Sequence, residues 1–172
     1  MRLLVEAHPG AGKTTALLRL AELLRHRGVA LAGFFTEEIR DGGRRLGFSI
    51  ETLSGKRGTL AHVGFAGPPK VGRYGVDLAG FERLALPALR ISADAVLIDE
   101  LGKMELASAA FRDAVADLLD EATPVVATVH TFRHPFTDRL KRRPDVEVIR
   151  LTRGNRDELP ALLAERLAPT WR

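Results

Sequence analysis

The sequence contains no cysteine, and this absence excludes a whole group of chemistries. Without cysteine the chain has no disulfides, no thiolate nucleophile and no cysteine-bound zinc. The five histidines (His8, His26, His62, His130 and His134) are scattered, and their spacing matches no metal-ligand pattern. The sequence therefore gives no indication of a zinc centre.

Long apolar runs are also absent. No run approaches the roughly 20 apolar residues that span a bilayer, and the N-terminal stretch MRLLVEAHPG lacks the pattern of a signal peptide. The 172 residues are 45% hydrophobic, which is the size and composition of one ordinary globular domain. We therefore expect a single soluble, cytoplasmic domain over residues 1–172, a monomer that does not associate with membranes.

The charge balance is basic, with a formal net charge of +4. Such an excess suits phosphorylated ligands, nucleic acid or membrane surfaces. The densest basic run, residues 139–143 (RLKRR), is interpreted as an exposed helix end, where cations are favoured by the helix dipole. No aromatic residues are interleaved with this run, so nucleic-acid binding is the weaker interpretation.

Short apolar runs typical of strands alternate with helical patterns along the chain. Strands are expected at residues 2–6, 29–36, 95–98, 124–129 and 146–151, and helices after Lys13, Asp77, Ser108 and Asn155. Gly28 is expected to end the first helix, Ser108 and Asn155 to cap their helices, and Pro87 to kink or shorten its helix. Alternation with strands this apolar predicts a doubly wound α/β fold, a three-layer sandwich whose mainly parallel sheet has helices on both faces.

Residues 44–63 break this alternation. Leu46, Phe48 and Ile50 alternate with polar or small residues, and Ser54–Gly58 turns the chain before further strand-like residues. The pattern predicts an antiparallel β-hairpin inserted into the α/β order. The stretch GRYGVD, residues 72–77, is expected to be a loop that leads into the next helix.

The stretch AHPGAGKTT, residues 7–15, lies between the first predicted strand and the first predicted helix. This is the context of a phosphate-binding loop, in which backbone N–H groups at a helix N-terminus converge on phosphate oxygens. Lys13 then reaches the β- and γ-phosphates, and the Thr14 hydroxyl is placed to coordinate Mg²⁺. Ala7 stands where the strict motif has glycine, at the exit of the strand, where a methyl group is tolerated.

The stretch AVLIDELGKME, residues 95–105, supplies the groups that hydrolysis needs. Asp99 ends an apolar strand, which is the position of the Mg²⁺-side carboxylate in such folds. Glu100 is predicted to turn its carboxylate to the same cleft and to orient or deprotonate the attacking water. For Lys103, a second phosphate contact is the alternative to an exposed surface cation.

His130 ends the strand PVVATVH, which in sheets of this order lies between the other two. Its side chain is a candidate to sense the γ-phosphate or the water, and a purely structural histidine is the alternative. Arg73 and Arg133 are candidates for a charge-stabilising arginine, as are the other arginines of the chain.

Six segments together resemble, in the same order, those of the THEP family of nucleoside-triphosphatases. They are HPGAGKTT, GFFTEEIR, GRYGVDLAGFE, VLIDELGKMEL, VVATVH and LTRGNRDEL, and the resemblance extends from Met1 to about Leu167. The phosphate loop is generic, whereas its combination with IDELGKMEL and the late NRD is specific. The resemblance implies a RecA-like P-loop fold and Mg²⁺-dependent hydrolysis of several nucleoside triphosphates.

The motifs and the resemblance define the candidate site. The catalytic candidates are Lys13, Glu100 and His130, and the candidate ligands of Mg²⁺ are Thr14 and Asp99. The candidate nucleotide-binding residues are Ala7, His8, Pro9, Gly10, Ala11, Gly12, Lys13, Thr14, Thr15, Val96, Leu97, Ile98, Asp99, Glu100, Leu101, Gly102, Lys103, Asn155 and Arg156. The resemblance places Asn155 and Arg156 near the base, with a helix cap as the alternative for Asn155.

Three classes of function stay open. The first is a hydrolase that converts ATP, GTP, CTP and UTP to diphosphate and phosphate, and the others are a nucleotide or small-molecule kinase and a nucleic-acid-associated ATPase. No N-K-x-D guanine-reading motif occurs, which disfavours a dedicated GTPase and predicts broad base tolerance. The Asp99-Glu100 pair favours water as the acceptor, because a kinase must exclude water. Only the basic charge suggests nucleic acid, and the hairpin is the one segment that suits a kinase lid.

Overall fold

The structure is a computed structural model of the chain, and it describes residues 1–168. Its elements are β1 (Arg2–Ala7), α1 (Lys13–His26), β2 (Leu31–Asp41), β3 (Arg44–Thr52), β4 (Arg57–His62), β5 (Lys70–Val71), β6 (Tyr74–Val76), α2 (Leu78–Leu89), β7 (Ala95–Leu101), the 3₁₀ turn η1 (Glu105–Ala107), α3 (Ala109–Asp120), β8 (Val125–His130), α4 (Pro135–Lys141), β9 (Glu147–Arg150) and α5 (Leu159–Leu167). The strands form one nine-stranded sheet in the order β5-β6-β4-β3-β2-β7-β8-β1-β9. The last four residues of the single domain expected over residues 1–172 lie outside the described part.

The half of the sheet from β2 to β9 is parallel. Within it β8 lies between β7 and β1, so the C-terminal ends of these three strands are neighbours, and Ala7 is paired with His130. These strands are buried on both faces, which explains why their sequences are apolar without alternation. The predicted α/β fold with a RecA-like arrangement is confirmed, as is the position of the strand that ends at His130.

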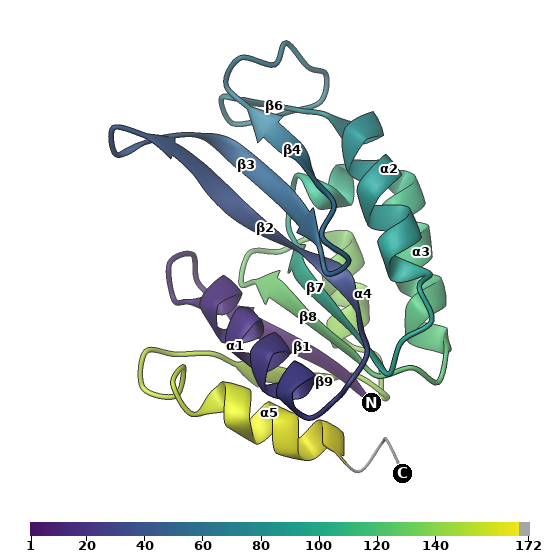
Figure 1. The fold of residues 1–172 in the computed structure, drawn as a ribbon. Coiled ribbons are helices and arrows are strands. Elements are labelled where there is room, and N and C mark those ends of the chain that lie inside the picture. The colour runs from purple at the N-terminus through teal and green to yellow at the C-terminus, as the bar shows by residue number, and fades with distance from the viewer. Residues whose placement is uncertain (169–172) are drawn as a thin grey trace.

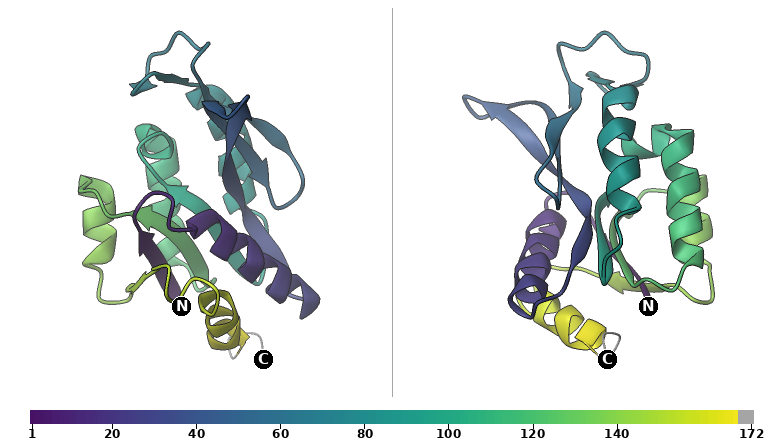
Figure 2. Two further views of the ribbon diagram at one scale, coloured as in Figure 1. Left: turned by 90° about the vertical axis from the view of Figure 1, so that its left-hand side faces the viewer. Right: turned by 45° about the vertical axis from the view of Figure 1, so that its right-hand side comes forward.

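Helices cover both faces of the parallel half, as Figures 1 and 2 show. On one face α1 and α5 pack together, through a core that includes Leu20, Leu24 and Leu163. On the other face, the core beneath α2, α3 and α4 contains a cluster of three fully buried rings, Phe34, Phe81 and Phe111. The Phe81 and Phe111 ring centroids are 5.0 Å apart, and Phe34 lies 5.7 Å from each of the other two.

The strand β2 belongs to both halves of the sheet. Its first residues pair with β7 in parallel, and Gly33 is required there because a Cβ at this position would lie 1.8 Å from the carbonyl oxygen of Leu97. Its later residues pair with β3 in an antiparallel hairpin that projects beyond the start of α1 (Figure 1). We call residues 36–50, where β2 and β3 pair beyond the parallel sheet, the hairpin arm. β4 pairs with the other edge of β3, and β6 and β5 continue the antiparallel half.

Two expectations about strands differ from the structure. β2 continues to Asp41 instead of ending at Thr36, because the added residues pair as an exposed ribbon that needs no apolar face. The expected loop at residues 72–77 contains β6, because Tyr74–Val76 adds to the edge of β4.

Some of the helix ends predicted from the sequence are confirmed, and one is wrong. Ser108 caps α3 by accepting a hydrogen bond from the backbone N–H of Phe111, and Gly28 follows the end of α1 with a positive φ of 77°. Pro87 lies within the last turn of α2, which ends at Leu89. The expectation that Asn155 caps the last helix is wrong: α5 begins at Leu159, and the Asn155 side chain instead bonds to the backbone of Thr152 and Arg150.

The basic run at residues 139–143 lies at the end of α4, as expected, and two of its four cations, Lys141 and Arg143, form ion pairs. Lys141 has only 17% of its side chain exposed and donates to the Glu6 carboxylate and to the carbonyl oxygen of His130. Arg143 forms ion pairs with Asp120 at 2.8 Å and Asp145 at 2.9 Å. Across residues 1–168, none of the helices combines the length and apolar character that a membrane crossing requires.

Candidate active site

The phosphate-loop residues connect β1 to α1 in a tight turn. Gly10 and Gly12 have φ values of 77° and 102°, in the left-handed region where residues with a side chain are strained. Lys13 is the first residue of α1 and is 7% exposed, because its side chain folds back across the loop. Its Nζ donates to the carbonyl oxygen of Ala7 at 3.2 Å, so the ammonium group lies over the concave side of the turn. The helix N-terminus adds unpaired N–H groups to the same place.

Thr14 and Asp99 meet although 85 residues separate them in sequence. The Thr14 hydroxyl donates to Asp99 Oδ2 at 2.6 Å, and the hydroxyl of Thr128 in β8 donates to Asp99 Oδ1, also at 2.6 Å. Each oxygen of the carboxylate therefore has a hydroxyl partner. Among residues 1–168, no three histidine, aspartate or glutamate side chains are grouped as a metal site.

Asp99 is a buried carboxylate with 1% of its surface exposed. Burial is the largest effect on its pKa, and together with the charge of Glu100 it raises that pKa from 3.8 to about 6, against the opposing hydrogen bonds from Thr128 and Thr14. An ionised carboxylate that is buried in this way lowers the stability of the folded protein. Residues of this kind are typical of functional sites.

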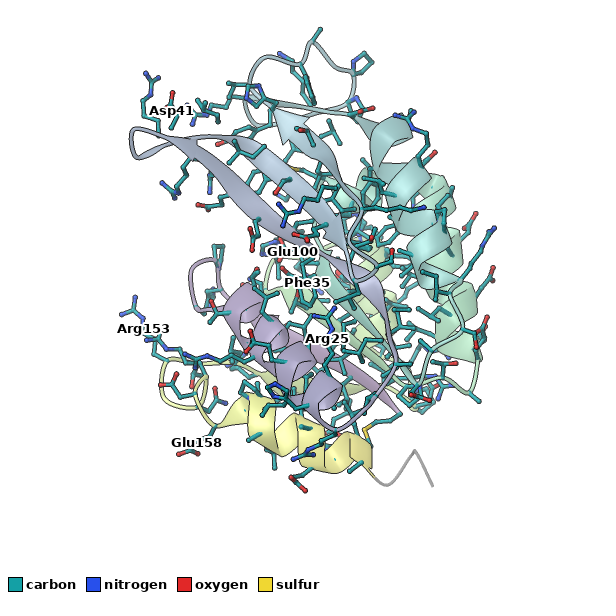
Figure 3. All side chains as sticks on the ribbon, viewed as in Figure 1. Arg25, Phe35, Asp41, Glu100, Arg153 and Glu158 are labelled. Carbon is teal, nitrogen blue, oxygen red and sulfur yellow. The ribbon has the colours of Figure 1, made fainter. Side chains whose placement is uncertain are left out.

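Glu100 follows Asp99 in β7, and its carboxylate contacts His130 and Lys13. One of its oxygens lies 2.5 Å from His130 Nε2, and the other lies 3.8 Å from Lys13 Nζ. An ionised carboxylate only accepts, so the hydrogen of the first contact comes from His130. The Nδ1 atom of His130 is buried and has no hydrogen-bond partner among the described residues. Figure 3 shows Glu100 between the start of α1 and the hairpin arm.

A cavity of about 670 Å³ opens on these groups. Its lining combines the phosphate loop, the ends of β7 and β8, and the hairpin arm: Pro9, Gly10, Gly12, Lys13, Thr14, Thr15, Thr36, Glu37, Glu38, Arg45, Phe48, Val71, Glu100, Lys103, Met104, Glu105, His130 and Phe132. A cavity of this size fits a small-molecule ligand. Lys103 faces it with its Nζ 4.8 Å from the centre of the Phe132 ring.

Glu105 is a buried carboxyl group that lines this cavity, with 4% exposed, whereas Asp99 does not line it. Burial, reinforced by the charge of Glu100, raises the pKa of Glu105 well above its ordinary value. Gly102 lies between the two carboxyl groups, since a Cβ on Gly102 would lie 2.8 Å from Glu105 Oε2 and 3.0 Å from Glu100 Oε1.

Comparison with known proteins agrees with this geometry. A family model described as NTPase matches residues 2–164. The nucleoside-triphosphatase THEP1 of Thermotoga sp. (strain RQ2) is 40% identical over 162 residues, which cover 92% of this chain and 91% of the relative. The chain belongs to the THEP1 nucleoside-triphosphatase family. Two solved structures match almost the whole chain.

The first of these structures is the crystal structure of THEP1 from Aquifex aeolicus, with a TM-score of 0.84 and 35% identity over 97% of this chain and 99% of that chain. The second is the solution structure of a human cancer-related nucleoside triphosphatase, with a TM-score of 0.87 and 37% identity over 99% of each chain. The predictions of the fold, of the family and of an enzyme of the NTPase class are thereby confirmed.

Several residues expected at the nucleotide from the THEP resemblance do not line the cavity, among them Asp99 and Asn155. Val96, Leu97, Ile98 and Leu101 are at most 1% exposed and belong to the two cores, and Ala7 is also buried in the core. His8, Ala11 and Gly102 do not line the cavity. Arg156 does not line the cavity either, although its Cδ would be 3.7 Å from a Cβ on Gly12.

Some residues around the cavity were not found from the sequence. Thr128 carried a signal, as a polar residue inside the apolar strand VVATVH. Glu38 and Arg45 carried none, because they reach the cavity only through the folding of the hairpin arm. Of the two arginines considered earlier, Arg133 has 90% of its side chain exposed beside Asp138, and Arg73 bonds to Tyr74 and to the backbone of Arg45.

Proposed function

We propose that this protein hydrolyses ATP, GTP, CTP and UTP to nucleoside diphosphate and phosphate, with Mg²⁺ and with little preference for the base. The observation that carries the proposal is the convergence of two motifs. Thr14 of the phosphate loop is 2.6 Å from Asp99, and Lys13 is 3.8 Å from Glu100 on the same strand. The phosphate loop, the carboxylate proposed to face the metal and the proposed general base therefore surround one point. Phosphoryl transfer requires such an arrangement.

The residues present fit Mg²⁺. A threonine hydroxyl and a carboxylate are oxygen donors, which Mg²⁺ prefers, and a site with few protein ligands leaves room for phosphate oxygens and water. Thr14 Oγ1 and Asp99 Oδ2 already lie within hydrogen-bond distance of each other, so both can face one ion. When it is bound, Mg²⁺ neutralises charge on the phosphate oxygens.

In the proposed reaction Lys13 binds the β- and γ-phosphates, while backbone N–H groups of the loop hold the remaining oxygens. Glu100 accepts a proton from the attacking water as the water oxygen bonds to the γ-phosphorus and the bond to the β-phosphate oxygen breaks. His130 holds the Glu100 carboxylate through the 2.5 Å contact and so fixes its orientation. The aligned base and the bound phosphates then favour the in-line geometry of the displacement.

Broad base tolerance is supported by the loop between β9 and α5. The Asn155 amide oxygen accepts from the Thr152 N–H at 2.8 Å, and its amide nitrogen donates to the Arg150 carbonyl at 2.9 Å. A side chain used in this way to shape its own loop contributes little to reading a base edge. Without such polar contacts a pocket discriminates weakly between ligands.

The experiment measures phosphate release from each of the four triphosphates under identical conditions, with Mg²⁺ and with EDTA, in the absence of any other acceptor. We expect all four to be hydrolysed with efficiencies within about two orders of magnitude, and hydrolysis to stop in EDTA. Parallel reactions with RNA and DNA test the nucleic-acid-associated alternative. Release from a single triphosphate would refute base tolerance, and no release without an acceptor would refute the hydrolase.

The role of Glu100 is tested by Glu100→Gln, which keeps the size of the side chain and removes its basicity. Nucleotide affinity should stay near that of the wild type, because Lys13 and the loop still bind the phosphates. Turnover should fall by about 10²–10⁴, the usual contribution of a general base. If the variant instead lost binding and turnover together, Glu100 would serve the metal or the fold, and His130 would be the next candidate.

A further inference from the structure

The hairpin arm brings two carboxylates to the wall of the cavity. Glu37 and Glu38 of the hairpin arm line it, and Glu100 faces the same space. A bound triphosphate is strongly negative, so these carboxylates oppose it unless a cation offsets them. Among the described lining residues, the cations are Lys13, Lys103 and Arg45. Arg45 is the one that the arm itself supplies.

Arg45 is held in place from several directions. Its Nε donates to the Tyr74 hydroxyl at 2.9 Å, and its Nη1 donates to Glu38 Oε1 at 3.0 Å. Its guanidinium carbon lies 5.3 Å from the centre of the Phe48 ring and 5.6 Å from that of Tyr74, which is the range of cation–π contacts. A guanidinium carries five N–H donors, so donors beyond these two bonds stay available for an anion.

Tyr74 is itself fixed, which makes the support of Arg45 rigid. The Tyr74 side chain is 7% exposed, and its hydroxyl also accepts a hydrogen bond from Arg73 at 3.3 Å. The Arg73 guanidinium in turn donates to the backbone carbonyl of Arg45. Arg73 therefore acts on the arm and on Tyr74, and it does not line the cavity.

We propose that Arg45 contacts the γ-phosphate oxygens during hydrolysis and stabilises the charge that develops on them, with Tyr74 as its positioning residue. The inference rests on the proposed function. An arginine supplied within the same chain is a known means of transition-state stabilisation in phosphoryl transfer. In the structure Glu38 is an anionic partner of Arg45, and in the proposed reaction the phosphate oxygens bind the same guanidinium.

The test compares Arg45→Ala with Arg44→Ala in steady-state hydrolysis of ATP. Arg44 is the preceding residue of β3, is exposed and does not line the cavity, so it controls for loss of positive charge on the arm. We expect Arg45→Ala to lower kcat by at least about 100-fold, the lower part of the range known for such arginines. KM should change by less than about fivefold, since the loop and Lys13 still bind the ground state. Arg44→Ala should retain wild-type kinetics.

Two further measurements separate a contact with substrate from a structural effect. Added guanidinium at millimolar concentration should restore kcat of Arg45→Ala by about tenfold or more, which a misfolded arm would not permit. Tyr74→Phe should lower kcat in the wild-type background, because Arg45 loses its 2.9 Å bond, and should have no further effect in the Arg45→Ala background.

The outcomes distinguish this inference from the proposed function. A wild-type protein that releases no phosphate would overturn the proposed function and the inference with it. Normal release by the wild type together with a kcat of Arg45→Ala within threefold would overturn the inference alone. Equal losses in Arg45→Ala and Arg44→Ala would also overturn it, because the general charge of the arm would then explain the effect.

Discussion

Asp99→Asn is expected to stabilise the fold above pH 6 while it removes the metal-side carboxylate. Burial raises the pKa of Asp99 from 3.8 to about 6, so the folded protein binds this proton more tightly than the unfolded chain does. The stability that the protonated group contributes is fully present below pH 3.8 and is lost as the pH rises through about 6. At neutral pH the ionised carboxylate therefore opposes folding.

The size of the effect follows from the two pKa values. The difference between about 6 and 3.8 corresponds to about 3 kcal/mol of unfolding free energy at pH 8. Asparagine carries no such proton, and its amide can still bond to the Thr14 and Thr128 hydroxyls, one as acceptor and one as donor. The variant should therefore exceed the wild type by up to about 3 kcal/mol at pH 8, and the gap should close toward pH 4.

The assay is urea unfolding of both proteins between pH 4 and pH 8, with EDTA present and nucleotide absent. Asp117→Asn, on the exposed side of α3, is the matched control and should show no such gap. Hydrolysis by Asp99→Asn should lose its dependence on Mg²⁺ along with its rate, so stability rises as function falls. An Asp99→Asn protein no more stable than the wild type at pH 8, or a gap that is constant with pH, would refute the reasoning.

Three further changes test the loop and the core. Lys13→Ala should nearly abolish turnover and weaken triphosphate binding, and turnover within about threefold of the wild type would contradict the phosphate-loop assignment. Ala7→Gly should leave turnover almost unchanged but lower the unfolding free energy by about 1–2 kcal/mol, since Ala7 is buried and glycine is more flexible in the unfolded chain. Calorimetry measures the change in unfolding free energy, and kinetics on the same sample measure turnover. Phe111→Ala should cost about 3–5 kcal/mol in urea unfolding, because its ring is fully buried between Phe34 and Phe81.

The parallel half of the sheet could be predicted because its signals are local. β1, β7 and β8 are short apolar runs, and the glycines of the phosphate loop mark the passage from β1 to α1. The end of β2 and the short strands β5 and β6 could not be predicted in the same way. Residues 37–45 at the tip of the arm are exposed, apart from the half-buried Ile39, so no apolar alternation marks where β2 ends.

The same distinction between local sequence signals and long-range pairing applies to the residues of the candidate site. Lys13, Thr14 and Asp99 were found because each lies inside a motif, and the structure brings them together. Arg45 was missed because a chain with 26 lysines and arginines offers no reason to single it out. Its position at the cavity depends on the long-range pairing of β2 with β3 and on Tyr74, 29 residues away. The roles of all these residues stay predictions until the variants are measured.

The place of β1 between β8 and the edge strand β9 has a consequence for how the protein folds during synthesis. β1 leaves the ribosome well before its neighbours β8 and β9, so Arg2 cannot pair with Val125, or Leu3 with Glu147, until those strands have been synthesised. Contacts of such long sequence separation form slowly, because loop closure must precede them. The nascent chain therefore exposes an unpaired apolar strand until about residue 150 has emerged. A chain shortened before β9 lacks the strand that covers the outer edge of β1, and we expect it to require a chaperone.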